Sequence, residues 1–240
     1  MGPEYQCHSC SREFAAGLVR VPRAWGKGGE AMAEAAFTHL PYPEAAVVAE
    51  ETLADQILAL ASELPERPLV LGGCCCSHVG AVEGLATRHD WFGVVWVDAH
   101  GDLNTPESSP SGNEWGMPLR MILDAGAVDP TQVALLGVRD LDPPEREFIR
   151  DAGIHTGKDA VDHALRETDC VYVALDFDGL DEADVASFMP VAGGIRLDEA
   201  VETFHRIAAT KTVLGAGFTG LVPDERNLEP AARLASALGL

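Results

Sequence analysis

The sequence predicts an α/β protein, a three-layer α/β/α domain around a mostly parallel sheet. Short continuous apolar runs alternate along the chain with stretches of helical periodicity. The runs show no polar alternation, which is typical of parallel strands that are buried on both faces. The length of 240 residues suits one such domain, and no repeat or linker divides it. We therefore expect a single domain over residues 1–240.

The expected elements follow from local patterns, taken in chain order. Apolar residues at helical spacing among Glu and Asp indicate a first helix over 45–64, which Pro65 ends. Apolar segments are expected as strands at 68–73, 93–99, 132–138, 169–176 and 212–218. Further helices are expected at 78–88, 119–125, 144–152, 197–210 and 228–238. The helix over 197–210 has Asp198 and Glu199 in its first turn, where acidic side chains complement the helix dipole.

Composition excludes several classes of partner. The chain carries 38 acidic and 17 basic side chains, for a formal net charge of −21. This balance argues against nucleic-acid binding, which needs a basic face, and against binding to an anionic membrane surface. No apolar run approaches the roughly 20 residues that span a bilayer, and residues 1–30 lack a signal-peptide pattern. We expect a soluble cytoplasmic protein.

Cysteine usage points to a reducing compartment. Of the six cysteines, Cys74, Cys75 and Cys76 are consecutive, which does not suit a regular disulfide framework. Cys7 and Cys10 have the spacing of half a zinc knuckle, but no second Cys/His pair follows at zinc-finger spacing. That segment is therefore either a partial zinc site or an irregular terminus.

Two predicted strands end in clusters of acidic residues. Asp98, His100 and Asp102 follow the strand over 93–99 at alternate positions, so an extended segment would point all three to one side. Asp176 and Asp178 follow another strand with the same alternation. Crowded carboxylates repel each other unless a divalent cation lies among them, and Asp/His sets suit manganese, zinc or iron. The alternative is a set of solvated loop acids.

Five segments resemble conserved motifs of the arginase, or ureohydrolase, family in family order. They are LGGCCCS (71–77), DAHGDLNTPESSPSGNEWG (98–116), GVRDLDPPE (137–145), LDFDGLD (175–181) and PVAGGI (190–195). The resemblance runs from about residue 68 to 221. It implies a hydrolase with a binuclear manganese centre, in which a metal-bridging hydroxide attacks a guanidinium-type carbon.

The resemblance also implies a ligand for each metal. Asp98 and Asp176 would bridge the two ions, His100 and Asp178 would complete one site, and Asp102 would belong to the other. The resemblance makes Asp102, or a nearby carboxylate, the group that handles the proton in catalysis. The full predicted ligand set is Cys75, Asp98, His100, Asp102, Asp176 and Asp178.

Cys75 departs from the family pattern, because it stands where the family has its first metal-binding histidine. A thiolate is a softer ligand and prefers zinc or iron(II) to manganese. We expect Cys74 and Cys76 to point away from Cys75 as small buried residues, although another registration would make either of them the ligand. His78 is the nearest spare imidazole and is a further alternative.

Several substrate-binding positions of the family have matching residues in this chain. Asn104, Ser111 and Asn113 match positions that bind the α-carboxylate of arginine, and Asp142, accompanied by Glu145, matches the position that reads the α-amino group. The match favours an amino-acid substrate over a decarboxylated amine such as agmatine. Ordinary turn chemistry also accounts for Asn and Ser in such a loop.

Three family features are missing. Trp115 stands where the family has a proton-shuttling histidine, and an indole does not exchange protons near neutral pH. The last predicted strand and its end, 212–221, contain no Glu or Asp to pair with a guanidinium. Residues 1–4 resemble a loop that in the family follows the first strand, so that strand is expected to be missing or shortened. An uncovered sheet edge would favour a homo-oligomer, and the family resemblance implies a trimer or hexamer.

Three functions are consistent with these residues. The leading one is a metal-dependent hydrolase that cleaves a C–N bond in a guanidino or amidino amino-acid-like substrate, such as a hydroxyguanidino compound. The alternative is a catalytically impaired arginase-like paralogue that binds a metal or ligand. A third is an enzyme that uses the cysteines at 74–76 as a nucleophile or redox centre, for which the sequence offers no evident base.

Overall fold

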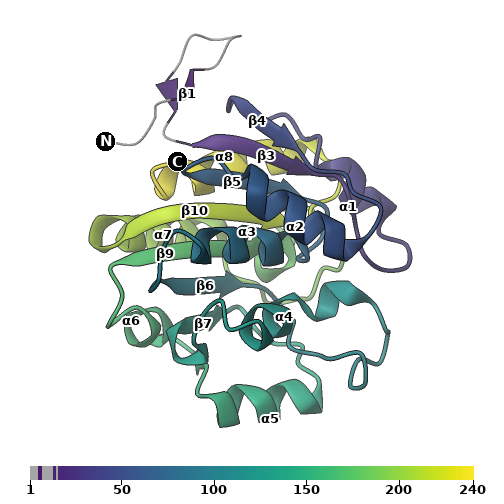
Figure 1. Ribbon diagram of the computed structural model, residues 1–240, viewed down its shortest axis with the longest axis vertical. Helices are drawn as coiled ribbons and strands as arrows, with labels where there is room; N and C mark the ends of the chain where they lie inside the picture. The colour runs from purple at the N-terminus through teal and green to yellow at the C-terminus, as the bar shows by residue number, and fades with distance from the viewer. Residues whose placement is uncertain (1–4, 7–12, 15) are drawn as a thin grey trace.

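An eight-stranded sheet runs through the computed structural model, which describes residues 5–6, 13–14 and 16–240 (Figure 1). The strand order is β4-β3-β5-β10-β9-β6-β7-β8, and every neighbouring pair is parallel. The strands are β3 (Gly17–Val21), β4 (Glu44–Val47), β5 (Pro68–Gly72), β6 (Gly93–Val97), β7 (Val133–Leu136), β8 (His155–Thr156), β9 (Cys170–Asp176) and β10 (Thr212–Thr219). Two short strands, β1 (Tyr5–Gln6) and β2 (Glu13–Phe14), pair with each other outside this sheet.

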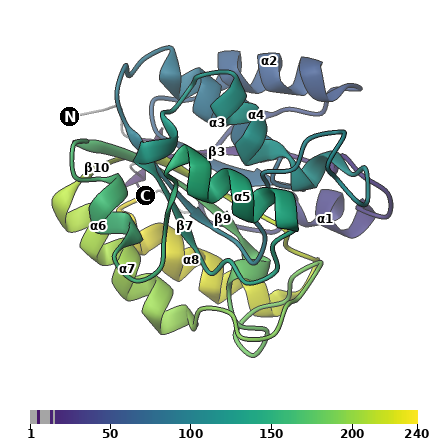
Figure 2. The same cartoon turned by 90° about the horizontal axis from the view of Figure 1, so that it is seen from below.

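Helices cover both faces of the sheet and complete the three layers (Figure 2). One face packs against α2 (Leu53–Glu63), α3 (Ser77–Ala86), α4 (Pro118–Asp124) and α5 (Pro143–Ala152). The other packs against α6 (Ala160–Ala164), α7 (Leu197–Thr210) and α8 (Leu228–Ala237), with Ala35 from α1 (Glu30–Ala35) in the same core. The predicted α/β/α architecture is confirmed, and the sheet is parallel throughout.

The alternation of side chains along each strand separates the two cores. In β9, Val171, Val173 and Leu175 pack on the side of α7 and α8. Tyr172 and Ala174 of the same strand pack on the side of α2 and α3. Strands that are apolar on both faces are what a sheet between two helical layers requires.

The predicted helix over 45–64 is wrong in its first part. Glu44–Val47 is the edge strand β4, and the helix begins only at Leu53. Thr52 is the cap of this helix, because its side chain accepts a hydrogen bond from the backbone N–H of Asp55. The valine that extended the helical pattern, Val47, belongs instead to a half-exposed strand. The other predicted strands and helices are present with ends shifted by a few residues.

Strand β3 lies inside the sheet, between β4 and β5, yet the sequence did not indicate it. Arg20 interrupts its apolar pattern. The guanidinium is buried because it donates hydrogen bonds to Glu44 Oε2 at 2.7 Å and to the Ala36 carbonyl at 2.6 Å. A buried charge whose partners lie in other segments cannot be recognised from local hydropathy.

Some predictions concern residues whose structure is not described. The partial zinc site at Cys7 and Cys10 and the family-like loop at 1–4 lie outside the described residues. The missing or shortened first strand and the single domain over 1–240 therefore stay predictions. Within the described residues, no helix is long and apolar enough to cross a membrane.

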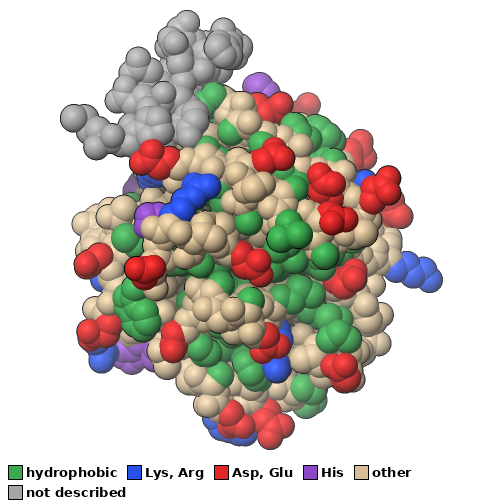
Figure 3. All heavy atoms as spheres, viewed as in Figure 1, with side chains coloured by type: hydrophobic (Ala, Val, Ile, Leu, Met, Phe, Trp, Pro, Cys, Tyr) green, Lys and Arg blue, Asp and Glu red, His purple; other side chains and the backbone are tan. Residues whose placement is uncertain are grey.

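The parallel sheet fixes the place of any site. The carboxyl ends of β5, β10, β9 and β6, which are neighbours in the sheet, all lie at one edge. The surface in Figure 3 carries many scattered Asp and Glu side chains and few basic ones, as the net charge of −21 requires.

Candidate functional site

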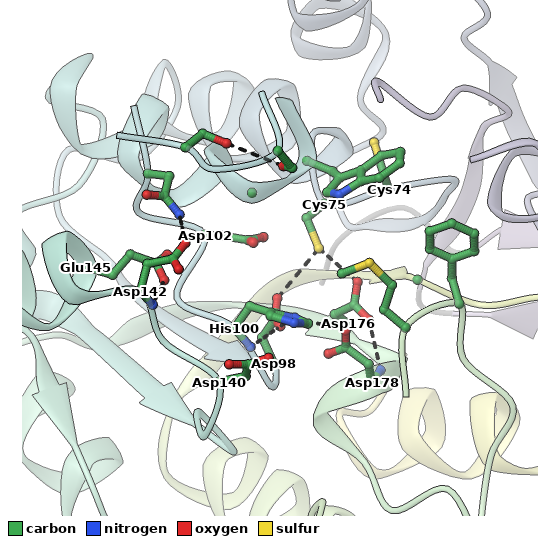
Figure 4. A pocket seen from close by; sticks show the side chains of 18 of the residues that line it. Cys74, Cys75, Asp98, His100, Asp102, Asp140, Asp142, Glu145, Asp176 and Asp178 are labelled. Carbon is green, nitrogen blue, oxygen red and sulfur yellow. Dashed lines mark hydrogen bonds and ion pairs between the residues drawn. The ribbon is translucent and has the colours of Figure 1, made fainter. Parts of the chain in front are cut away.

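A cavity of about 200 Å³ opens at the carboxyl ends of these central strands (Figure 4). We call its polar base the acidic floor, formed by Cys75, Asp98, His100, Asp102, Asp176 and Asp178. We call the large apolar side chains that also line it the apolar wall, formed by Met32, Trp115, Phe188 and Met189. The structure thus brings all the predicted ligand residues to one cavity.

The first half of the floor is built around His100. Its Nδ1 lies 3.1 Å from Asp178 Oδ2 and 3.3 Å from Asp98 Oδ1. Burial would lower the pKa of His100, but the hydrogen bonds and charges of Asp178 and Asp98 raise it to about 12. Ligand atoms of these three residues lie within 4.8 Å of one another, which suits one cation.

The second half of the floor is built around Cys75. Its Sγ lies 3.0 Å from Asp176 Oδ2 and 3.7 Å from Asp98 Oδ2. Cys75, Asp98 and Asp102 form a second group of ligand atoms within 4.8 Å of one another. Burial, together with the negative charges of Asp176, Asp102 and Asp98, raises the pKa of the Cys75 thiol well above its usual value. Asp98 belongs to both groups, as a bridging ligand would.

Asp102 provides an independent indication that a cation fits here. Among the described residues it is the one non-glycine with a positive φ, at 53°. Its Oδ2 is buried and finds no hydrogen-bond partner among those residues. Burial and the charge of Asp98 raise the pKa of Asp102 well above its usual value. Strain and an unpartnered carboxylate oxygen are tolerated at functional sites, and a divalent cation would satisfy that oxygen.

Asp176 and Asp178 are held by the backbone as well as by burial. Asp176 Oδ1 accepts a hydrogen bond from Asp178 N at 2.9 Å, and Asp178 Oδ1 accepts one from Ala99 N at 3.0 Å. Burial and then the charge of Asp178 raise the pKa of Asp176 to about 7, and burial and then the charge of Asp98 raise the pKa of Asp178 to about 6. Such crowding is favourable only with positive charge among the carboxylates.

The predicted amino-acid-binding residues form a network beside the floor. Asn104 Nδ2 donates to Asp142 Oδ2 at 2.9 Å, and Asn104 Oδ1 accepts from Ser108 Oγ at 2.9 Å. Glu145 uses both carboxylate oxygens to accept backbone N–H groups, from Leu103 and from Asp142, each at 2.9 Å. Glu145 therefore fastens the loop after β6 to the start of α5.

Ser111 and Asn113 lie further along the same loop. Ser111 lines the cavity, and its Oγ accepts the backbone N–H of Asn113 at 3.2 Å. The side chain of Asn113 turns towards another segment, where its Oδ1 accepts the backbone N–H of Lys27 at 3.0 Å. Their part in substrate binding stays a prediction.

Of the apolar wall, the sequence indicated Trp115 and not Met32, Phe188 or Met189. Trp115 lies edge-to-face with Phe188, with the ring centroids 5.7 Å apart. Gly26 and Gly29 make room for the indole, since a Cβ at Gly26 would overlap the ring. Phe188 lies two residues before the PVAGGI motif, which is the one sequence signal that could have placed it near the site. Nothing local to Met32 links it to the cavity.

The end of β10 and the residues after it, to Leu221, contribute no carboxylate of their own to the cavity. Gly220 lines the cavity with a φ of 67°, and a Cβ there would overlap the Asp176 carboxylate. The close approach of Gly220 to Asp176 leaves no space for a larger side chain at this point.

The other two cysteines are small buried residues, as expected. Cys74 and Cys76 pack in one cluster with Met32, apart from the core that contains Cys75. Cys74 also lines the cavity. Cys74 Sγ accepts the backbone N–H of Trp25 at 3.3 Å.

His78 does not reach the floor as an alternative ligand. Its Nδ1 lies 3.1 Å from Tyr172 Oη, and its Nε2 lies 3.2 Å from Thr219 Oγ1. Both ring nitrogens are therefore engaged behind Cys75.

Comparisons with known proteins agree with this geometry. Residues 30–239 match the family model described as "Arginase family". The chain is 34% identical to an arginase of Bacillus caldovelox over 205 residues, which cover 72% of this chain and 69% of that protein. It is 37% identical to a Staphylococcus aureus arginase over 168 residues, 58% of this chain and 56% of the relative. The crystal structure of a Bacillus subtilis arginase superposes with a TM-score of 0.81 at 26% identity, covering 93% of this chain and 97% of the other.

Proposed function

Because the chain belongs to the arginase family, we propose that it hydrolyses a C–N bond in a guanidino or amidino compound with an amino-acid-like end. One observation carries the proposal: two groups of potential ligands share Asp98 at the bottom of a cavity. A buried oxygen of Asp102 that has no hydrogen-bond partner among the described residues points to the same need for a cation.

Two divalent cations would be held by this chain's own side chains. Asp98 and Asp176 would bridge them, His100 and Asp178 would complete one site, and Cys75 and Asp102 the other. When bound, the cations would supply an activated water and positive charge for the developing charge of the reaction. Manganese is the proposed metal, with zinc or iron(II) favoured on the Cys75 side by the soft sulfur. Asp102 is the carboxylate that we propose to accept the proton.

The substrate would lie between the floor and the wall. Asn104, Ser111 and Asn113 would hold its α-carboxylate, and Asp142, with Glu145 behind it, its α-amino group. The reacting end would meet Gly220 and Trp115 in place of a carboxylate and an imidazole. A full guanidinium cation would lose an ion-pair partner there, so a neutral or modified group such as a hydroxyguanidine fits better.

The test compares two substrates on metal-loaded protein. Urea release from L-arginine should be slow, because losing general acid–base help alone lowers rates by roughly 100- to 10,000-fold. A hydroxyguanidino analogue should be turned over faster. Arginine turnover on the order of 10 per second or more would overturn the substrate proposal but leave the family chemistry intact.

A catalytically impaired paralogue is the second candidate, and Trp115 and Gly220 are the observations that favour it. Metal analysis of the purified protein separates the two. Two metals per chain with turnover of any amidino compound supports the hydrolase. One metal or none, without turnover, supports a binding protein.

The proposed assembly is a homo-oligomer, a trimer or hexamer. The outer strand β4 carries Val47 with 45% of its surface exposed, and Phe37 nearby in the chain is 59% exposed. A subunit contact would cover such an edge. Light scattering that gives a monomer mass at all concentrations would contradict it. The free thiols at positions 74–76 suit a reducing compartment such as the cytoplasm.

A further inference from the structure

We propose that Tyr172, His78 and Thr219 form a hydrogen-bond relay that ends on the sulfur of Cys75 and makes this half of the floor selective for a thiophilic cation. The inference rests on the proposed metal centre. It assigns a positioning role to three side chains that neither hold the substrate nor belong to the predicted ligand set.

The three side chains stand in line behind Cys75 on three different elements. Tyr172 Oη in β9 lies 3.1 Å from His78 Nδ1 in α3. His78 Nε2 lies 3.2 Å from Thr219 Oγ1 at the end of β10, and that oxygen lies 3.1 Å from Cys75 Sγ. All three have no measurable solvent exposure. Buried polar groups that contact one another in series must divide donors and acceptors among themselves.

The number of donor hydrogens on the three side chains determines the direction of the relay. The His78 ring is fully buried and contacts a phenol and a hydroxyl through its two nitrogens, so it is neutral and has a single N–H. If Tyr172 donates to Nδ1, the N–H at Nε2 is free to donate to Thr219, whose hydroxyl then donates to Cys75. In the opposite direction, His78 Nδ1–H donates to the phenol oxygen of Tyr172. The phenol hydrogen then has no acceptor among the described residues. The first arrangement satisfies every donor and delivers a hydrogen bond to sulfur.

The surrounding backbone is shaped to hold this arrangement. A Cβ at Gly217 in β10 would lie 2.5 Å from Tyr172 Oη and 2.6 Å from His78 Nδ1. Any larger residue there would push the two side chains apart. On the other side of the imidazole, the ring of Trp96 packs edge-on at 5.0 Å between centroids. The imidazole is therefore held in one orientation.

A hydrogen bond to sulfur has a chemical consequence for the site. It orients Sγ as a ligand, and second-layer partners of this kind tune metal affinity. Thr219 Oγ1 also has contacts of 3.4 Å with the Leu175 carbonyl and Asp176 Oδ2, both longer than its contact with Cys75. The relay side thus presents an oriented sulfur ligand, which suits zinc or iron(II), while the His100 side presents nitrogen and oxygen donors.

The experiment measures metal preference without relying on turnover. Metal-free protein is given zinc and manganese in competition, and bound metal is counted by mass spectrometry. Cobalt(II) is used in parallel, because a thiolate ligand gives a near-ultraviolet charge-transfer absorption. The variants are Thr219→Val, Thr219→Ser as the rescue that keeps a hydroxyl, and Tyr172→Phe. Thr168→Val is the matched control, a buried threonine bonded to the Leu165 carbonyl instead.

Thr219→Val should weaken zinc binding by roughly 10- to 100-fold and shift or weaken the cobalt charge-transfer absorption. Manganese binding on the His100 side should stay near that of the wild type. Thr219→Ser should restore both readouts, Tyr172→Phe should give a smaller loss, and Thr168→Val should change neither. Circular dichroism of the metal-free variants checks folding.

Two further results separate this inference from the proposed function. Wild-type zinc preference and cobalt absorption in Thr219→Val would overturn the relay and leave the hydrolase proposal standing. A wild-type protein that binds one zinc through sulfur, loses it in Thr219→Val and hydrolyses nothing would overturn the hydrolase and support the relay.

Discussion

The acidic floor and the apolar wall differ in where their residues come from. The floor is supplied by the segments that follow the parallel strands β5, β6 and β9, so the backbone of the sheet sets its geometry. The wall is assembled from α1, a short 3-10 helix that contains Trp115 and a loop, with Met32, Trp115 and Phe188 meeting only in the folded chain. By the sequence resemblance, the floor is expected to keep the family ligand pattern at all positions but Cys75, and the wall is expected to carry Trp115 in place of the family histidine. The difference indicates a reaction centre fixed by the sheet and a substrate pocket that loops can change independently.

The contrast between floor and wall requires the acidic floor to be one metal centre shared by both ligand groups. Asp98→Asn should give the largest effect, because Asp98 belongs to both ligand groups. We expect loss of bound metal and a fall in turnover of roughly 1,000-fold or more, about 4 kcal/mol of transition-state stabilisation. Metal counting and product release measure both. Asp140→Asn, at an acidic position that lines the cavity outside both groups, should keep its metals. Two metals retained by Asp98→Asn would contradict the assignment.

Gly220 is the point where floor and wall touch. Gly220→Ala should lower the free energy of unfolding by about 3 kcal/mol, from a left-handed backbone and overlap with the Asp176 carboxylate. Gly193→Ala is the matched control. It has a φ of 85° but open space around the new Cβ, and should lower the free energy by only about 1 kcal/mol. Urea unfolding measures both. Equal losses in the free energy of unfolding for the two variants would show that the Asp176 carboxylate can move away from the new Cβ at little cost.

Trp115→Ala tests whether the wall is independent of the floor. The indole is partly buried against Gly26 and Phe188, so we expect the free energy of unfolding to fall by about 2 kcal/mol. Metal content should not change. Trp91→Ala is the control, because its side chain is 54% exposed and its loss should be about 1 kcal/mol or less. If Trp115→Ala also loses metal, floor and wall are coupled and the separation is wrong.

The same contrast explains what the sequence could predict. The alternation of Asp98, His100 and Asp102 after a buried strand is a local pattern, and the parallel sheet brings it to Asp176 and Asp178. The wall has no such pattern, because Met32 and Phe188 come from segments more than 150 residues apart in the chain. Their meeting depends on packing that no local window contains.

The relay and the missed strand show the same limit. His78 was predicted only as a spare ligand, since its partners Tyr172 and Thr219 lie on distant strands. Strand β3 was missed because Arg20 breaks its apolar pattern, and the partners that make its burial possible lie elsewhere. Long-range pairing of buried polar groups is therefore what sequence patterns could not supply.

The smallest effect concerns the segment that carries Phe188 to the wall. Asp184 anchors it at the start of α7, where its carboxylate accepts Leu197 N at 2.9 Å and Arg196 Nε at 2.7 Å. Asp184→Asn should lower the free energy of unfolding by about 0.5–1 kcal/mol, because the pair with Arg196 is largely exposed. Asp198→Asn, on the same helix with its side chain 88% exposed, is the control and should change little.

The stabilisation that Asp184 contributes should depend on pH. The hydrogen bond from Arg196 comes first among the causes that hold the pKa of Asp184 below its usual value, and the Leu197 N–H adds to it against burial. A carboxyl group with a lowered folded-state pKa stabilises the fold above its unfolded pKa of about 3.9 and loses that contribution as the pH falls through the folded value. The difference between wild type and Asp184→Asn in urea unfolding should therefore be full at pH 6 and shrink below about pH 4. A difference that persists undiminished at pH 2.5 would show that the carboxylate charge does not anchor this part of the wall.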